Sequence, residues 1–115
     1  MAITLYGIPN CDTVKRARAW LTERGIEHRF HDFKKSGVPL DALDAALAQL
    51  GWDRLLNRRG TAWRALPEAL KASVHDSASA RQVMLDHAST IKRPLVDWGD
   101  ARYSVGFDAA NWPYQ

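Results

Sequence analysis

The segment that most restricts the fold of this chain is a strand–helix–strand pattern at residues 3–33. Residues 3–6 form a short β-rich run that Gly7 ends. From Asp12 onward apolar residues recur at helical spacing, and Gly25 follows as a natural stop. Residues 26–33 alternate as a second strand does. Because a unit of about thirty residues of this kind joins two parallel strands through a helix, the pattern predicts an α/β fold.

The rest of the chain predicts further helices and then a hairpin. Leucines recur on one helical face over residues 40–50, whereas residues 52–64 show no clear period. A β-hairpin with Gly99-Asp100 at its turn completes a mixed sheet. Shorter helices are expected around residues 67–72 and over residues 107–112. A further helix is expected to begin at a capping box formed by Ser79 and Gln82.

Composition excludes several classes of protein. With 115 residues, 46% hydrophobic and 25% charged, the chain has the balance of one globular domain. Its single cysteine excludes an internal disulfide, and the four histidines form no pair at ligand spacing, so we expect no metal site. No apolar run approaches the ~18 residues that a membrane span needs. The first residues lack the basic region of a signal peptide, so we expect a cytoplasmic protein.

The positive charge of the chain is unevenly distributed. Residues 1–59 hold ten Lys and Arg against seven Asp and Glu, and residues 60–115 hold six of each. The excess thus lies in the half that contains the cysteine, where it could attract a small anion or favour a thiolate. A net charge of +3 is modest for a nucleic-acid-binding domain, so we do not expect a nucleic-acid partner.

Cys11 is the residue whose position says most about chemistry. It lies in the turn between the first strand and the first helix, where helix N–H groups lack partners and the helix dipole is positive. Lys15 and Arg16 add charge one turn further on. A lone cysteine is more often an inert core residue, but the polar Asp12 and Thr13 are typical of a helix start. The position therefore predicts a reactive thiolate.

Three motifs in order resemble one family. They are residues 9–15 (PNCDTVK), residues 55–61 (LLNRRGT) with Trp63 and Arg64, and residues 91–96 (IKRPLV). Together they resemble the arsenate reductase/Spx family of thioredoxin-like proteins, most closely its YffB-type members. The resemblance covers nearly the whole chain.

The resemblance implies one thioredoxin-like domain over residues 1–115. Its mixed four-stranded sheet would consist of a βαβ and a ββα half, with a helical insertion at about residues 39–90. Cys11 would be the nucleophile, with Arg93 and Pro94 beside it and the bond between them in the cis form. Arg93 would then offer its planar fork to an oxyanion or a carboxylate.

The chain also departs from the family pattern. Val14 stands where thioredoxins and some Spx-like members have a second cysteine, so an outside thiol must resolve any disulfide. The family's arsenate reductases have three arginines around the cysteine, and only Arg93 matches clearly. Asn57 occupies a second position, with Arg58 and Arg59 adjacent, and there is no arginine near Val105 and Gly106.

These observations predict a glutathione-dependent thiol reductase. Cys11 would attack a small-molecule or protein disulfide, and Arg93 with Arg58 or Arg59 would hold an anionic group. Asn10 and Lys15 are further candidates for the substrate site. Glutathione would serve as co-substrate, with glutaredoxin as a further partner and no bound cofactor. The alternatives are an arsenate reductase that uses glutathione and glutaredoxin, and a Spx-like regulator that binds RNA polymerase.

Overall fold

The computed structural model describes residues 2–114 and divides the chain into two compact units. The first unit combines residues 1–36 with residues 93–115, and the second comprises residues 37–92. The second unit is therefore inserted between the two segments that build the first. Within residues 2–114, no helix is long and apolar enough to cross a membrane.

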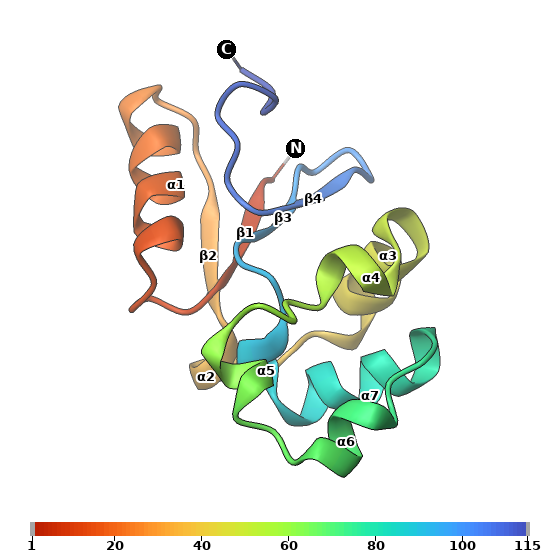
Figure 1. Cartoon of the computed structure of the whole chain (residues 1–115). Helices are drawn as coiled ribbons and strands as arrows, with labels where there is room; N and C mark the ends of the chain where they lie inside the picture. Colours follow the sequence, from red (N-terminus) through yellow and green to blue (C-terminus); the bar gives the residue numbers. More distant parts are fainter. Residues whose placement is uncertain (1, 115) are drawn as a thin grey trace. The chain divides into compact units, whose positions relative to one another are not determined.

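The first unit is built on a four-stranded mixed sheet (Figure 1). Its strands are β1 (Thr4–Gly7), β2 (Arg29–Asp32), β3 (Leu95–Asp97) and β4 (Tyr103–Val105), in the order β2-β1-β3-β4. β1 pairs with β2 in parallel and with β3 in antiparallel, and β4 is antiparallel to β3. This confirms the predicted α/β class and the mixed, thioredoxin-like sheet.

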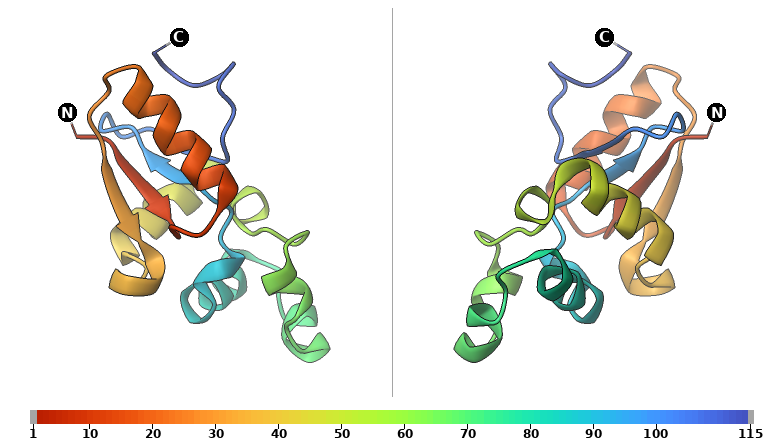
Figure 2. Two further views of the ribbon diagram at one scale, coloured as in Figure 1. Left: turned by 90° about the vertical axis from the view of Figure 1, so that its left-hand side faces the viewer. Right: turned by 90° about the vertical axis from the view of Figure 1, so that its right-hand side faces the viewer.

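Helix α1 (Asp12–Glu23) covers one face of this sheet (Figure 2). It buries Val14, Ala17, Trp20 and Leu21, so the spacing read from the sequence is the spacing of its buried face. Gly25 follows with a φ of 67°, and the N–H of Ile26 donates to the Leu21 carbonyl at 3.0 Å. This arrangement is a Schellman motif, which satisfies the last carbonyls of the helix.

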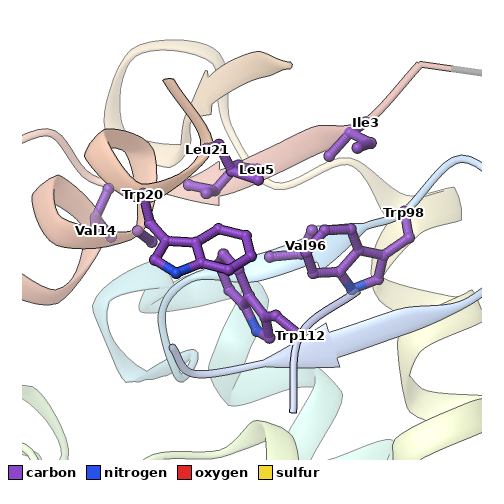
Figure 3. Close-up of a cluster of buried hydrophobic side chains, with 9 residues drawn as sticks. Ile3, Leu5, Val14, Trp20, Leu21, Val96, Trp98 and Trp112 are labelled. Atoms are coloured by element: carbon purple, nitrogen blue, oxygen red, sulfur yellow. The ribbon is translucent and has the colours of Figure 1, made fainter. Parts of the chain in front are cut away.

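The core of the first unit lies between α1 and the sheet. Apolar residues of β1, α1 and β3 meet there with Trp98, which directly follows β3, and with Trp112 from the C-terminal segment (Figure 3). Trp112 contacts Trp98 and Trp20 edge-on, with ring centroids 4.9 and 5.5 Å apart. The segment that was expected to be a helix over residues 107–112 forms only a turn closed on the Asp108 carbonyl. Aromatic packing, in place of the expected helix, thus holds this segment against the core.

The second unit is helical. It contains α3 (Leu40–Leu50), α4 (Trp52–Leu55), α5 (Thr61–Arg64), α6 (Glu68–Ala72), α7 (Ser77–Asp86) and the 3-10 helix η1 (Ala88–Thr90). Its segments are joined by an isolated bridge between Leu56 and Ile91, and by Arg81, whose guanidinium binds the Asp44 carboxylate. A one-turn helix α2 (Phe33–Ser36) closes the preceding segment of the first unit.

Candidate functional site around Cys11

Cys11 is the N-cap residue of α1. Its backbone is extended, with φ −135° and ψ 121°, and its carbonyl accepts the first helical hydrogen bond from the Lys15 N–H at 2.9 Å. Its side chain makes no capping hydrogen bond, so the sulfur is not used to close the helix end. The residue is half-buried and packs against the core between α1 and the sheet. The thiol therefore combines a fixed backbone with access from solvent.

The approach of β1 to α1 explains why the chain turns at this point. Gly7, the last residue of β1, lies so close to the helix that a Cβ there would be 2.9 Å from Cγ2 of Val14. Only a residue without a side chain fits such an approach without a shift. The close contact seats the first turn of α1 against the end of β1.

The strand register brings other segments to the same edge of the sheet. Tyr6 pairs with Leu95, and Leu95 pairs with Val105, so Pro94 and Gly106 flank the end of β1 that leads to Cys11. The Gly106 N–H donates to the Pro94 carbonyl at 2.9 Å. The Arg93–Pro94 peptide bond is cis, as expected from the resemblance.

The predicted site residues of the first unit differ in exposure. Arg93 is half-buried, with its Nε atom buried, and precedes β3 at the edge described above. Pro94 is fully buried. Asn10 and Lys15 are exposed on either side of Cys11 in the chain. Their roles toward a substrate stay predictions.

Arg58 and Arg59 belong to the second unit. Arg58 forms an ion pair with Asp53, and its guanidinium carbon lies 5.3 Å from the centroid of the Trp52 ring. Arg59 is exposed, and its backbone N–H donates to the Asn57 side chain at 3.2 Å. Within its own unit Arg58 already has an anionic partner, whereas the Arg59 side chain has no carboxylate partner among residues 2–114.

The face of the sheet away from α1 holds a second polar cluster. Tyr6 stacks on Phe33 and contacts His31, with ring centroids 6.1 and 5.2 Å apart. Burial, with a smaller contribution from the charge of Asp97, raises the pKa of Tyr6. The Tyr103 hydroxyl donates to the same Asp97 carboxylate at 3.4 Å. The sequence patterns did not predict that these side chains lie together.

Neither a cluster of metal ligands nor the cavity described below brings the predicted site residues together. Among residues 2–114, no three side chains of His, Cys, Asp and Glu gather closely enough to hold a metal ion. A cavity of about 600 Å³ lies at the opposite end of α1 from Cys11. None of the residues predicted for the site lines it. Its lining comprises Ala2, Ile3, Thr22, Gly25, Ile26, Glu27, His28 and Arg29.

The sequence patterns predicted a short helix over residues 107–112 but not what this segment packs on. Phe107 follows Gly106 and contacts Trp112 and Trp20 edge-on, with ring centroids 4.8 and 6.3 Å apart. The available signal was the closeness of Phe107 and Trp112 in the sequence, because large aromatic side chains tend to pack against one another.

The comparisons with known proteins agree with this geometry. The model of the ArsC family matches residues 6–113. The solved structure of the protein named YFFB (PA3664) superposes with a TM-score of 0.86 at 45% identity, covering 92% of this chain and 91% of that one. An arsenate reductase (ArsC) related protein from Brucella melitensis superposes with a TM-score of 0.75 at 48% identity, covering 96% and 90%.

Sequence relatives point the same way. An uncharacterized protein of Haemophilus influenzae is 44% identical over 106 residues, which are 92% of this chain and 91% of that protein. The global transcriptional regulator Spx of Listeria innocua is 25% identical over 111 residues, covering 92% and 80%. The fold, the cysteine at the head of α1 and these matches lead to one conclusion: the chain belongs to the ArsC family.

Proposed function

We propose that the chain is a glutathione-dependent thiol reductase in which Cys11 is the only nucleophilic sulfur. The family match makes the chain a member of the arsenate reductase-like family with a thioredoxin-like fold. The proposed thiol reductase activity is supported above all by the position of Cys11. This half-buried residue lies at the N-terminal end of α1, and its side chain makes no capping hydrogen bond there.

The helix end supports the nucleophilic form of the sulfur. The first N–H groups of a helix have no carbonyl partners within it, and the helix dipole adds about half a positive charge there. The exposed Lys15 adds a full positive charge one turn further on. A thiolate is stabilised by each of these, and the thiolate is the species that attacks disulfides.

The reaction at Cys11 proceeds in two exchanges. The Cys11 thiolate attacks one sulfur of a disulfide, a mixed disulfide forms, and the other sulfur leaves as a thiolate. A glutathione thiolate then attacks the sulfur bonded to Cys11, and the Cys11 thiolate is released. This leaves the sulfur that Cys11 held in a disulfide with glutathione, and a second glutathione thiolate then releases it as a thiolate. Two glutathione thiols thus supply the two electrons and end as glutathione disulfide. Because the chain has one cysteine, the second exchange requires a thiol from outside.

The arginines supply the proposed recognition of anionic groups. Arg93 precedes β3 at the edge of the sheet where the loop to Cys11 begins, and a guanidinium binds a carboxylate through two parallel hydrogen bonds. We assign it to a carboxylate of glutathione. The part of Arg58 or Arg59 in a second contact stays a prediction; within its own unit Arg58 is engaged by Asp53.

The test is the mass of the intact protein after incubation with oxidised glutathione. We expect one glutathionyl group on the wild type, its removal by reduced glutathione, and no adduct on Cys11→Ser. Absence of an adduct on the wild type would refute the proposal. Turnover of arsenate, lost in Cys11→Ser, would assign arsenate reduction instead. Capture of RNA polymerase without either activity would assign the role of a regulator.

A conservative substitution tests the role of Arg93. Arg93→Lys keeps the charge but loses the two-pronged contact, so we expect slower adduct formation with an unchanged melting temperature. Arg102→Lys is the matched control, because Arg102 pairs with Asp100 in the hairpin turn of the same unit. Equal rates in the two variants would remove Arg93 from the site.

A further inference from the structure

We infer that the side of α1 that continues from Cys11, together with α2, is a docking surface for acidic polypeptide around the cysteine of a protein disulfide. This inference rests on the proposed function and names the class of protein substrate. The surface consists of Lys15, Arg18, Lys34 and Lys35, and we call it the basic flank. All four side chains are exposed.

Helix geometry places the first two cations beside the thiol. Residues three and four apart lie on one side of a helix, so Lys15 and Arg18 follow Cys11 along a single line. The guanidinium carbon of Arg18 lies 4.3 Å from the centroid of the Phe30 ring in β2. This contact fixes the guanidinium on the β2 side of the helix. The acidic Asp12 lies three residues before Lys15, but among residues 2–114 it forms no ion pair with it.

The other two cations come from the end of β2. β1 and β2 are parallel, so the residues that follow β2 lie at the same edge of the sheet as the loop to Cys11. Lys34 and Lys35 occupy this position in α2. The nearby Asp32 carboxylate accepts their backbone N–H groups at 2.9 and 3.4 Å, so it serves to cap α2.

The opposite side of α1 is closed to a partner. Trp20 there is covered by Phe107 and Trp112 of the C-terminal segment, which runs beside the helix (Figure 2). A polypeptide that presents its cysteine to Cys11 is therefore kept from that side of α1, and the basic flank lies on the sides of the helix that stay exposed.

The charges of the basic flank are not neutralised within the described part of the protein. None of its four cations forms an ion pair with a carboxylate of residues 2–114. By contrast, Arg81 pairs with Asp44 and Arg102 with Asp100 elsewhere in the chain. Unpaired cations gathered beside a reactive group raise the encounter rate with anionic partners. The chemistry that fits is a cysteine with Glu or Asp beside it.

The experiment uses three short peptides, each with a central cysteine as its pyridyl mixed disulfide. The residues on both sides of the cysteine are Glu, Gln or Lys. The Cys11 thiolate attacks the peptide sulfur, the bond to the pyridyl sulfur breaks, and thiopyridone is released and measured by its absorbance. At low salt we expect the Glu peptide to react about tenfold faster than the Lys peptide, with Gln between them. The preference should fade from about 20 mM to about 500 mM salt, as the Debye length falls from ~20 Å to ~4 Å.

Two adjacent residues give a matched pair of variants. Lys15→Glu and Arg16→Glu make the same change in net charge at neighbouring exposed positions, but Arg16 lies about 100° around the helix from Lys15. We expect Lys15→Glu and Arg18→Glu each to reduce the preference for the Glu peptide at least threefold, and Arg16→Glu to change it less than twofold.

The outcomes separate this inference from the proposed function. Equal rates for the three peptides in the wild type, or equal losses in Lys15→Glu and Arg16→Glu, would overturn the basic flank while leaving Cys11 as a nucleophile. An oligonucleotide that blocks the Glu peptide at equimolar concentration would assign the surface to nucleic acid instead. Failure of every peptide to release thiopyridone would refute the proposed function itself.

Discussion

The close approach of β1 to α1 allows a prediction with a calculable magnitude. In Gly7→Ala the new Cβ would lie 2.9 Å from Cγ2 and 3.7 Å from Cγ1 of Val14. Carbon atoms in contact are normally ~3.5–4.0 Å apart, so the helix must move outward by roughly half an ångström or more. Overpacking of this kind costs about 1–3 kcal/mol of the free energy of unfolding. We expect about 2 kcal/mol, because Val14 is fully buried and cannot turn away.

A double-mutant cycle identifies the cause of this loss. Val14→Ala alone removes two buried methyl groups and should cost about 2 kcal/mol. If the clash is responsible, Val14→Ala also creates the room that Gly7→Ala needs. The double variant should then lose about 2 kcal/mol, where simple addition gives about 4 kcal/mol. The measurement is urea unfolding of all four proteins.

Gly60→Ala is the matched control. A Cβ there would also meet an atom at 2.9 Å, but that atom is the amide nitrogen at the end of the Asn57 side chain. Because the end of a side chain can rotate, we expect a loss below about 1 kcal/mol. Additive losses of Gly7→Ala and Val14→Ala, or a loss in Gly60→Ala as large as in Gly7→Ala, would refute the argument.

Three further predictions concern stability. Asp76→Ala should lower the melting temperature at pH 7, since the Asp76 carboxylate caps α7 through the Ser79 N–H at 2.9 Å. Hydrogen bonds from Ser79 lower the pKa of Asp76. The stability that the cap contributes is therefore complete above the unfolded pKa near ~4 and is lost as the pH falls through the folded pKa. The melting curves of wild type and variant should thus converge in acid. Trp112→Ala should cost about 3–5 kcal/mol by urea unfolding, whereas Trp112→Phe should cost less than half as much. The raised pKa of Tyr6, caused by burial and Asp97, means that stability falls as the pH rises above ~10, where only the unfolded phenol ionises; this fall should be smaller in Tyr6→Phe.

The first half of the sheet was predictable because local and long-range requirements agree there. The apolar spacing of Val14, Ala17 and Leu21 is both helical and buried, and Gly25 stops the helix in a left-handed conformation. β2 is shorter than residues 26–33, because the backbone N–H of Ile26 is used to close α1. A strand pattern cannot show which residues a preceding helix will recruit.

Short helices were the main difference in the second unit. α4 and α5 each have four residues, too few to show a period of 3.6. The same holds for α2 in the first unit. The capping box was predicted at Ser79 and lies one turn earlier, where Asp76 is the cap and Ser79 its partner. Both pairs match the pattern of a polar residue three positions ahead of another, and the carboxylate that accepts the Ser79 N–H decides between them.

The candidate site was predictable only as far as its cysteine and its proline loop. Cys11 could be placed because the strand, the break and the helix are contiguous. Arg93 and Pro94 were placed beside it only by the resemblance of residues 91–96 to the family. The engagement of Arg58 by Asp53 could not be read from sequence, since both lie in a segment without a period. The same holds for Arg18, whose position over Phe30 depends on how α1 packs on β2.

The interrupted order of the first unit has a consequence for synthesis on the ribosome. Leu5 of β1 pairs with Val96 of β3, so this side of the central strand must wait until about 90 more residues have been made. At roughly 5–20 residues per second, the wait is on the order of 5–20 seconds. The inserted residues 37–92 emerge during this interval and can fold by their own contacts. The nascent chain thus holds an unfinished sheet, with one edge of β1 open to chaperones, until β3 appears.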